Sequence, residues 1–148
     1  MEAIQLIKEF KAQFDENLFK LYKDAYNYHL KNTEGFFKEK TDDELKESLK
    51  EQLNRECNYT LVYIDKKIIG YIMFIIEGGK IYLTELSVDE NCRNNQVATK
   101  LIKEVEKIAK EKHIKFIDLN CWSFNETAET LYEYLGFKRI RSLYRKEC

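Results

Sequence analysis

Proline is absent from the 148 residues of this chain, and only five residues are glycine. Segments rich in these residues typically form linkers between domains, and the chain contains no such segment, no internal repeat and no low-complexity tract. A chain of this length is of ordinary size for one folded unit. We therefore predict a single domain that extends over residues 1–148.

The chain also lacks an excess of charge and a long apolar run. Its 25 basic and 26 acidic residues give a formal net charge of -1, which argues against a polyanionic partner such as nucleic acid. No apolar stretch approaches the roughly 20 residues of a membrane span. Residues 1–10 lack the basic and then apolar layout of a signal peptide. We expect a cytoplasmic protein with no nucleic-acid or membrane partner.

Cysteine and histidine are few and scattered. The four cysteines include no C-x-x-C pair, and the two histidines do not complete a ligand cluster with them. The pattern therefore favours neither a metal site nor a disulfide framework. A cysteine–histidine nucleophile pair stays open, because such partners meet only in the folded chain. Burial as a small apolar side chain is the more common role of such a thiol.

In the first half of the chain, the hydrophobic pattern changes from helical to strand spacing. A short first strand is predicted in residues 3–10. Apolar residues three and four positions apart predict a helix from a cap at Asp15 to Leu30. A second helix is predicted from a cap at Thr41 or Asp42 to about Asn54. Three β-rich runs with short turns between them then predict an antiparallel meander over residues 59–64, 68–76 and 81–88.

The second half predicts a strand–helix–strand unit. A helix over Val97–Ala109 is followed by a strand over residues 115–121, and such a crossover joins parallel strands. A last helix is predicted from Asn125 to Leu135, ended by Gly136, and residues 137–148 are predicted to close the sheet as a strand. The fold class is therefore α+β with one parallel pair of strands.

A polar turn, CRNNQVA, lies between the predicted strand 81–88 and the helix that follows. Arg93 supplies a cation, and the first N–H groups of a helix have no partner within that helix. These features favour an anion such as phosphate. A turn that is simply solvated is the other interpretation, because Asn-Asn suits a turn without any ligand.

A second motif bears on that choice. Residues Asn125–Phe137 follow the pattern N-x-x-A-x-x-L-Y-E-x-x-G-F, which resembles the terminal motif of the GNAT family of acetyl-CoA-dependent N-acetyltransferases. The stretch Glu85–Ile102 is similar to that family's acetyl-CoA motif, R/Q-x-x-G-x-G/A, with Arg93 and Ala98 in the expected places. The resemblance extends over most of the chain, because the predicted elements occur in the family's order.

This resemblance implies a mixed, mostly antiparallel sheet with helices on both faces and a V-shaped separation of strands four and five. It also implies that acetyl-CoA enters that separation. Backbone groups of the fourth strand would pair with the pantetheine arm, and N–H groups of the next helix would bind the pyrophosphate. The acetyl-CoA residues implied in this way are Leu86, Ser87, Val88, Arg93, Asn94, Asn95, Gln96, Val97, Ala98, Thr99 and Asn125.

Gln96 departs from the family pattern, which has glycine at this position. Glycine permits left-handed backbone angles and a close approach to phosphate, whereas glutamine adds a Cβ atom and a long polar side chain. The position falls near the first turn of a predicted helix. We therefore expect helical backbone angles at Gln96 and a tolerated change.

Acetyl transfer to an amine needs a base, because an alkylammonium with a pKa near 10.4 is charged at neutral pH. Glu85 is the candidate base, directly or through water, and the alternative is that it faces solvent or bonds a neighbouring strand while water serves as the base. Tyr132 occupies the family position of the acid that protonates the departing thiolate. The backbone N–H of Val88 is the candidate donor to the developing oxyanion.

By family likeness, the acceptor is bound by the first half of the chain and its last segment. Aromatic side chains attract an alkylammonium group through cation–π contacts, and the candidate walls are Tyr26, His29, Phe36, Phe37 and Tyr144. The predicted function is acetyl transfer from acetyl-CoA to a primary amine of a small molecule or peptide. The alternatives are a non-catalytic acyl-CoA-binding module and a protein N-acetyltransferase. A short last segment leaves a sheet edge that could pair with a second copy as a homodimer.

Overall fold

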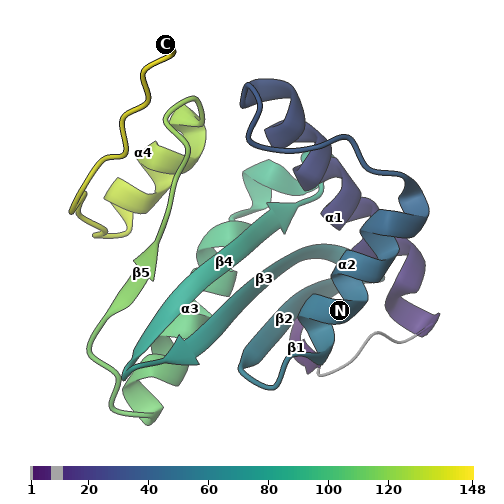
Figure 1. The fold of residues 1–148 in the computed structure, drawn as a ribbon. Coiled ribbons are helices and arrows are strands. Elements are labelled where there is room, and N and C mark those ends of the chain that lie inside the picture. Colours follow the sequence, from purple (N-terminus) through teal and green to yellow (C-terminus); the bar gives the residue numbers. More distant parts are fainter. Residues whose placement is uncertain (1, 8–11) are drawn as a thin grey trace.

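A mixed five-stranded sheet organises the chain, with the strands in the order β1-β2-β3-β4-β5 (Figure 1). The computed structural model describes the backbone of residues 2–7 and 12–148 and the side chains of residues 2–7, 16–93 and 96–148. Neighbouring strands from β1 to β4 are antiparallel, and β4 and β5 are parallel. This arrangement confirms the predicted fold class and the meander. The strands are β1 Glu2–Ile7, β2 Asn58–Asp65, β3 Lys67–Glu77, β4 Lys80–Val88 and β5 Ile117–Leu119.

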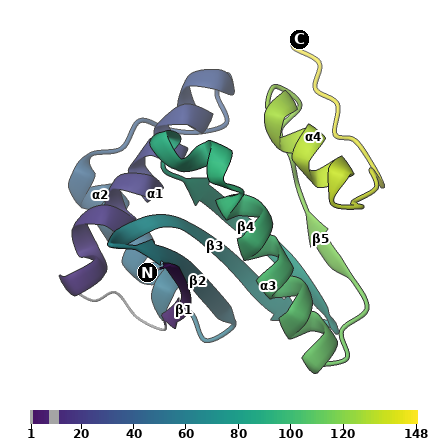
Figure 2. The same ribbon diagram turned by 180° about the vertical axis from the view of Figure 1, so that it is seen from behind.

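Helices lie on both faces of the sheet, as the views from opposite sides show (Figures 1 and 2). The first two helices cover one face and the third covers the other. The four helices are α1 Ala12–Asn32, α2 Asp42–Asn54, α3 Val97–Glu111 and α4 Glu126–Tyr134. Within the part of the chain that the structure describes, none of them is both long and apolar enough to cross a membrane.

The start of α1 differs from the prediction. A cap at Asp15 was expected, but α1 already includes Ala12, so Asp15 lies inside the helix and the predicted cap is wrong. The apolar residues that predicted this helix begin at Leu18, so the prediction missed its first turn. The predicted first strand extended to residue 10, and residues 8–10 lie outside the described residues.

The cap of α2 follows the prediction. The Thr41 side chain accepts a hydrogen bond from the Glu44 N–H at 3.2 Å, and the Glu44 carboxylate accepts one from the Thr41 N–H at 3.1 Å. This reciprocal arrangement is a capping box, which satisfies two N–H groups at the helix start. Leu45, Leu49 and Leu53 are buried along the face of α2 that packs on the sheet.

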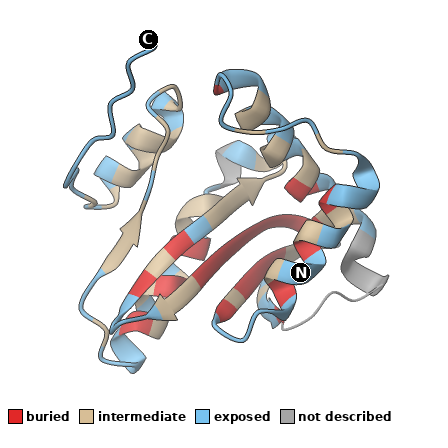
Figure 3. Cartoon of the chain, viewed as in Figure 1, coloured by how far each residue is buried: buried red, intermediate tan, exposed pale blue. Residues whose placement is uncertain are grey.

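Strand β3 is central and separates two apolar clusters. Its alternate side chains point to opposite faces, so Tyr71 and Met73 pack beneath α1 and α2, while Ile72 and Phe74 pack beneath α3. All four are fully buried. Figure 3 shows the buried residues concentrated on the inner strands and the helix faces that cover them, whereas α4 and the C-terminal segment are intermediate or exposed.

The C-terminal segment corrects a second prediction. Residues 137–148 were expected to form a strand, but they form none. A strand needs a paired edge and a buried face, and here Ile140, Leu143 and Tyr144 are 81%, 86% and 90% exposed. The preceding helix ends as predicted, with Gly136 at a φ of +94° and the Phe137 N–H donating to the Tyr132 carbonyl at 2.9 Å.

Candidate active site

Strands β4 and β5 pair at one end only. Their parallel register runs from Ile81 opposite Ile117 to Leu83 opposite Leu119, while β4 continues to Val88. No described strand pairs with that edge of β4 beyond Leu83. Figure 1 shows the two strands moving apart toward α4 and the end of α1. The structure therefore confirms the predicted V-shaped separation, which begins at Leu83.

A bulge in β4 lies where the separation begins. Glu85 is opposite Met73 and Leu83 is opposite Phe74, which leaves Thr84 as an extra residue on β4. The Thr84 hydroxyl donates to the Met73 carbonyl at 3.1 Å. This extra residue reverses the alternation of side chains along the rest of β4, which the sequence alone did not reveal.

The reversed alternation decides which way each side chain points after the bulge. Leu86 and Val88 pack with the cluster under α3, on the same face as Leu83. Glu85 and Ser87 face α1 and α2 instead. The Ser87 hydroxyl donates to the Leu21 carbonyl of α1 at 3.1 Å, and Glu85 contacts Tyr71.

The backbone of β4 offers donors to the open edge. The Asp89 N–H donates to the Ile69 carbonyl of β3 at 2.8 Å, and N–H groups alternate in direction along a strand. The N–H groups of Leu86 and Val88 therefore point away from β3, toward the separation. An extended polar chain could pair with them as another strand would.

The start of α3 supplies a second set of donors. A short 3-10 helix, Glu90–Asn95, joins β4 to α3, and the N–H groups of Val97, Ala98 and Thr99 have no partner within α3. Gln96 is the residue before the first turn, and its side chain is exposed and makes no capping hydrogen bond. With the exposed Arg93 nearby in the sequence, these three N–H groups are of the kind that binds an anion at a helix start.

The backbone angles of Gln96 overturn an expectation. Helical angles were predicted, but φ is 59° and ψ is 26°, which is the left-handed conformation. A residue with a Cβ atom is strained there by roughly 1 to 2 kcal/mol, because Cβ approaches the following carbonyl oxygen. The prediction failed because Gln96 ends the 3-10 helix and turns the chain into α3, rather than lying in the first turn of α3.

Gly70 of β3 allows α3 to begin close to the sheet. A Cβ atom at this position would lie 2.8 Å from Val97 Cγ1 and 3.4 Å from the Ser87 carbonyl oxygen. Val97 is buried at this contact. Gly70 was not predicted from the sequence, although a lone glycine inside an apolar strand often marks such a close approach.

Glu85 is a half-buried carboxyl group beside the separation. Burial raises its pKa to about 7, and side-chain hydrogen bonds from Tyr71 and Gln52 oppose that rise. The Tyr71 hydroxyl donates to Glu85 Oε1 at 3.0 Å. A carboxyl group with this pKa exchanges a proton readily at neutral pH.

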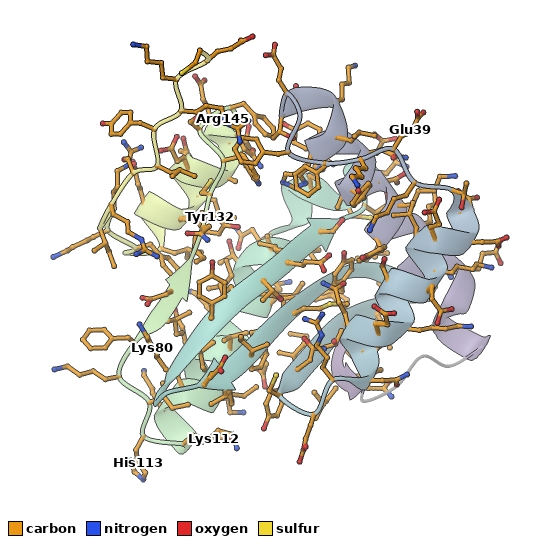
Figure 4. All side chains as sticks on the ribbon, viewed as in Figure 1. Glu39, Lys80, Lys112, His113, Tyr132 and Arg145 are labelled. Atoms are coloured by element: carbon orange, nitrogen blue, oxygen red, sulfur yellow. The ribbon has the colours of Figure 1, made fainter. Side chains whose placement is uncertain are left out.

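Tyr132 lies on α4 (Figure 4) and packs against the cluster under α3. Its ring meets the Phe137 ring edge-on, with 5.7 Å between the centroids. Burial, with a smaller effect of the Cys121 thiol, raises the pKa of Tyr132 to about 12, so the hydroxyl keeps its proton at neutral pH. Asn125 begins this helix, since its Oδ1 accepts from the Ala128 N–H at 3.2 Å.

The structure brings four of the five predicted acceptor residues into one aromatic cluster with Trp122 and Phe124. Ring centroids lie 5.4 Å apart for Tyr26 and Phe37, 4.7 Å for Phe36 and Trp122, and 5.9 Å for His29 and Phe124. The cluster therefore joins α1 and the α1–α2 loop to the β5–α4 loop. Trp122 and Phe124 were not predicted as acceptor-side residues, since nothing in their spacing links them to α1.

Tyr144, the fifth residue, is 90% exposed on the C-terminal segment. Its neighbour Arg145 (Figure 4) meets the aromatic cluster instead. The Arg145 guanidinium lies 3.5 Å from the centre of the Phe36 ring and donates to the Glu34 carbonyl at 3.3 Å.

Comparisons with known proteins agree with this geometry. Residues 16–137 match the model of the acetyltransferase (GNAT) family. Over 84 residues, the chain is 31% identical to the probable N-acetyltransferase camello of Xenopus laevis, a match that covers 51% of this chain and 36% of that protein. The chain thus corresponds to about a third of that relative's length.

Two solved structures share the fold at low sequence identity. A single-site mutant of the BH1408 protein from Bacillus halodurans has a TM-score of 0.85 at 19% identity, with 99% of each chain covered. The paia N-acetyltransferase from Thermoplasma acidophilum, in complex with coenzyme A, has a TM-score of 0.72 at 22% identity, with 92% of this chain and 90% of that chain covered. With its separated strands and a family match over residues 16–137, this chain belongs to the acetyltransferase (GNAT) family.

Proposed function

We propose that the protein transfers the acetyl group of acetyl-CoA to a primary amine of a small molecule or peptide, by direct attack in a ternary complex. The observation that supports this proposal is the position of Glu85. Glu85 lies on β4 just past the last residue that pairs with β5, and the pKa of its carboxyl group, about 7, suits a base. Family membership gives the reaction class, and Glu85 supplies the base that this reaction needs to remove a proton from the ammonium group.

The described residues fit acetyl-CoA as the acetyl donor. The outward N–H groups of Leu86 and Val88 suit the amides of a pantetheine arm, and those of Val97, Ala98 and Thr99 suit a pyrophosphate. The exposed side chain of Gln96 leaves these N–H groups uncovered. Acetyl-CoA, when bound, supplies an activated thioester. The backbone of Asn94 and Asn95 and the side chain of Arg93 complete the pyrophosphate site in this proposal, and Asn125 flanks the donor from α4.

In this mechanism, two side chains of the protein each transfer one proton. Glu85 removes one from the incoming ammonium group, directly or through a water molecule, which leaves a neutral nitrogen that can attack. Tyr132 donates its hydroxyl proton, or a hydrogen bond, to the sulfur that leaves. The N–H of Val88 stabilises the negative charge that develops on the carbonyl oxygen between these events.

Incubation with acetyl-CoA and a panel of small and peptide amines, with free thiol measured, tests the proposal. We expect thiol release that depends on the amine and falls by about 100-fold or more in Glu85→Gln. Mass spectrometry of the acetylated amine identifies the acceptor. Tight acetyl-CoA binding without thiol release from any amine would favour the acyl-CoA-binding alternative, and release only with folded proteins would favour a protein N-acetyltransferase.

We also propose a homodimer through the β5 edge and the C-terminal segment. Phe116 beside β5 is 57% exposed, and Ile140 and Leu143 are more exposed still. Apolar side chains next to a short edge strand favour pairing with a second copy. The two edges of a symmetric dimer would cover each other.

A further inference from the structure

We propose that Tyr71 of β3 and Gln52 of α2 are positioning residues, which hold the Glu85 carboxyl group at the separation between β4 and β5. This inference rests on the proposed function, because it takes Glu85 as the base. It adds two residues that belong to neither of the two sequence motifs.

Tyr71 reaches Glu85 because of the bulge in β4. If Thr84 were part of a regular ladder, Glu85 would share a face with Leu83 and point under α3. With the bulge, Glu85 shares a face with Tyr71, and the hydroxyl-to-Oε1 distance is 3.0 Å. Tyr71 is fully buried, and its ring is packed among the apolar residues beneath α1 and α2. A ring held in this way presents its hydroxyl at one place, so the direction of the hydrogen bond is fixed in advance.

Gln52 approaches the same carboxyl group from α2 and bonds it through its side chain. The residues on either side of it on the helix face, Leu49 and Leu53, are 0% and 2% exposed, so this turn of α2 is firmly seated. Among the described residues, Gln52 Oε1 is buried and has no hydrogen-bond partner. The hydrogen bond that lowers the pKa of Glu85 therefore comes from the N–H side of the amide.

The unpaired oxygen of Gln52 favours binding of a hydrogen-bond donor. Such an oxygen costs free energy unless a donor reaches it. In this proposal, a water molecule or the ammonium group of the substrate supplies that donor during the reaction.

Among the described residues, the groups that shift the pKa of Glu85 are hydrogen-bond donors, and no cation contributes to that shift. From α1, Tyr22 faces Glu85, and burial raises the pKa of Tyr22 far above its usual value. Gln52 of α2 and Tyr71 of β3 bond Glu85 directly. Ser48 and Arg55 interact with Tyr22 instead. Neutral donors favour the ionised carboxylate modestly, whereas a buried lysine or arginine would hold it ionised so firmly that it could not act as a base near pH 7.

The test compares Tyr71→Phe and Gln52→Leu with wild type. Each variant removes a donor to the ionised form, so we expect the Glu85 titration to move upward by about one pH unit. The acidic limb of the kcat/KM profile should move with it. Tyr22→Phe is the matched control, because it deletes a buried hydroxyl of the same cluster that bonds Ser48, and it should leave the titration in place.

The titration is read by 13C NMR of glutamate-labelled protein without substrate, with Glu85→Gln identifying the signal. An upward shift in either variant, together with an unmoved control, supports the positioning role even if no amine in the panel is acetylated. A Glu85 titration unchanged in both variants overturns it, whether or not the enzyme is active. Gln52→Leu serves as an independent test if Tyr71→Phe is too unstable to study.

Discussion

At the scale of single residues, two residues of the proposed site are in unfavourable states: one has a desolvated carboxyl group and the other has strained backbone angles. Glu85 loses solvent beside the separation, and Gln96 adopts a backbone conformation that glycine adopts more easily. Both features reduce the free energy of unfolding, and in the proposed function Glu85 is the base while Gln96 precedes the pyrophosphate-binding N–H groups. Such costs near a site are common when the arrangement serves function.

The half-buried carboxyl group of Glu85 makes the free energy of unfolding depend on pH. The pKa of Glu85 is raised from 4.5 to about 7 in the folded chain, so the stabilisation linked to its protonated form is complete below about pH 4.5 and is lost as pH rises through 7. We expect Glu85→Gln to be more stable than wild type by on the order of 1 to 3 kcal/mol at pH 8 relative to their difference at pH 4. Urea unfolding at both pH values measures this.

Glu77→Gln is the control for that comparison, because it neutralises an exposed carboxylate at the end of β3. The control should follow the wild-type dependence on pH. A Glu85→Gln advantage of equal size at pH 4 and pH 8 would mean that the carboxyl group is not buried in the way described.

The left-handed angles of Gln96 give a second prediction at this scale. Gln96→Gly should raise the free energy of unfolding by about 0.5 to 1 kcal/mol, which corresponds to a few degrees in Tm for a chain of this size. Acetyl-CoA should also bind more tightly, because the backbone can approach the phosphates more closely. Thermal unfolding and calorimetric titration measure the two effects. Gln96→Ala keeps the Cβ atom, so equal gains in both variants would contradict this reasoning.

At the scale of elements, the contact between α3 and β3 positions the first N–H groups of α3, which form the proposed pyrophosphate site. A Cβ at position 70 would approach Val97 Cγ1 to 2.8 Å, so Gly70→Ala must push the first turn of α3 away from the sheet. We expect a loss of about 1 to 3 kcal/mol in unfolding free energy and weaker acetyl-CoA binding.

The double variant Gly70→Ala with Val97→Ala tests the cause, because the second change removes the clashing methyl group. The two changes together should cost less than the sum of the single changes, in both urea unfolding and acetyl-CoA titration. Strictly additive losses would show that the contact does not position α3.

Much of the element order was accessible from the sequence. The cap at Thr41 or Asp42, the meander and the end of α4 at Gly136 were all predicted from local patterns, and the structure confirms them, with Thr41 as the cap. The bulge at Thr84 and the left-handed angles at Gln96 depend on contacts between distant segments, which a local pattern does not encode. For the same reason, the partners of Glu85 on β3 and α2 could not be predicted.

At the scale of the whole molecule, the C-terminal segment is the part least integrated into the fold. Residues 137–148 form no strand, and the Arg145 contact with Phe36 and Glu34 ties the segment to the α1–α2 loop. In the proposed dimer, a second copy would cover the apolar side chains that this segment exposes.

The dimer is tested by sedimentation velocity at micromolar concentrations. We expect a dimer for wild type and a shift toward monomer for the double variant Ile140→Ser with Leu143→Ser, because both side chains are largely exposed in the single chain. Lys146→Ser, in the same segment, is the control for a general effect of substitution. A wild-type protein that stays monomeric throughout the micromolar range would rule out the proposed interface.

Thr84 has no counterpart on β3, so it acts as a spacer of one amino acid. Deleting it would leave a regular ladder with the same pairs, because Glu85 would follow Leu83 directly and still lie opposite Met73. Taking Thr84 into the ladder would instead shift every later residue of β4 by one position and turn its side chain over. The Glu85 carboxyl group would then point among the hydrocarbon side chains below α3, and Leu86 would lie opposite Tyr71. The exclusion of one residue from the ladder therefore decides which face of the sheet carries this carboxyl group.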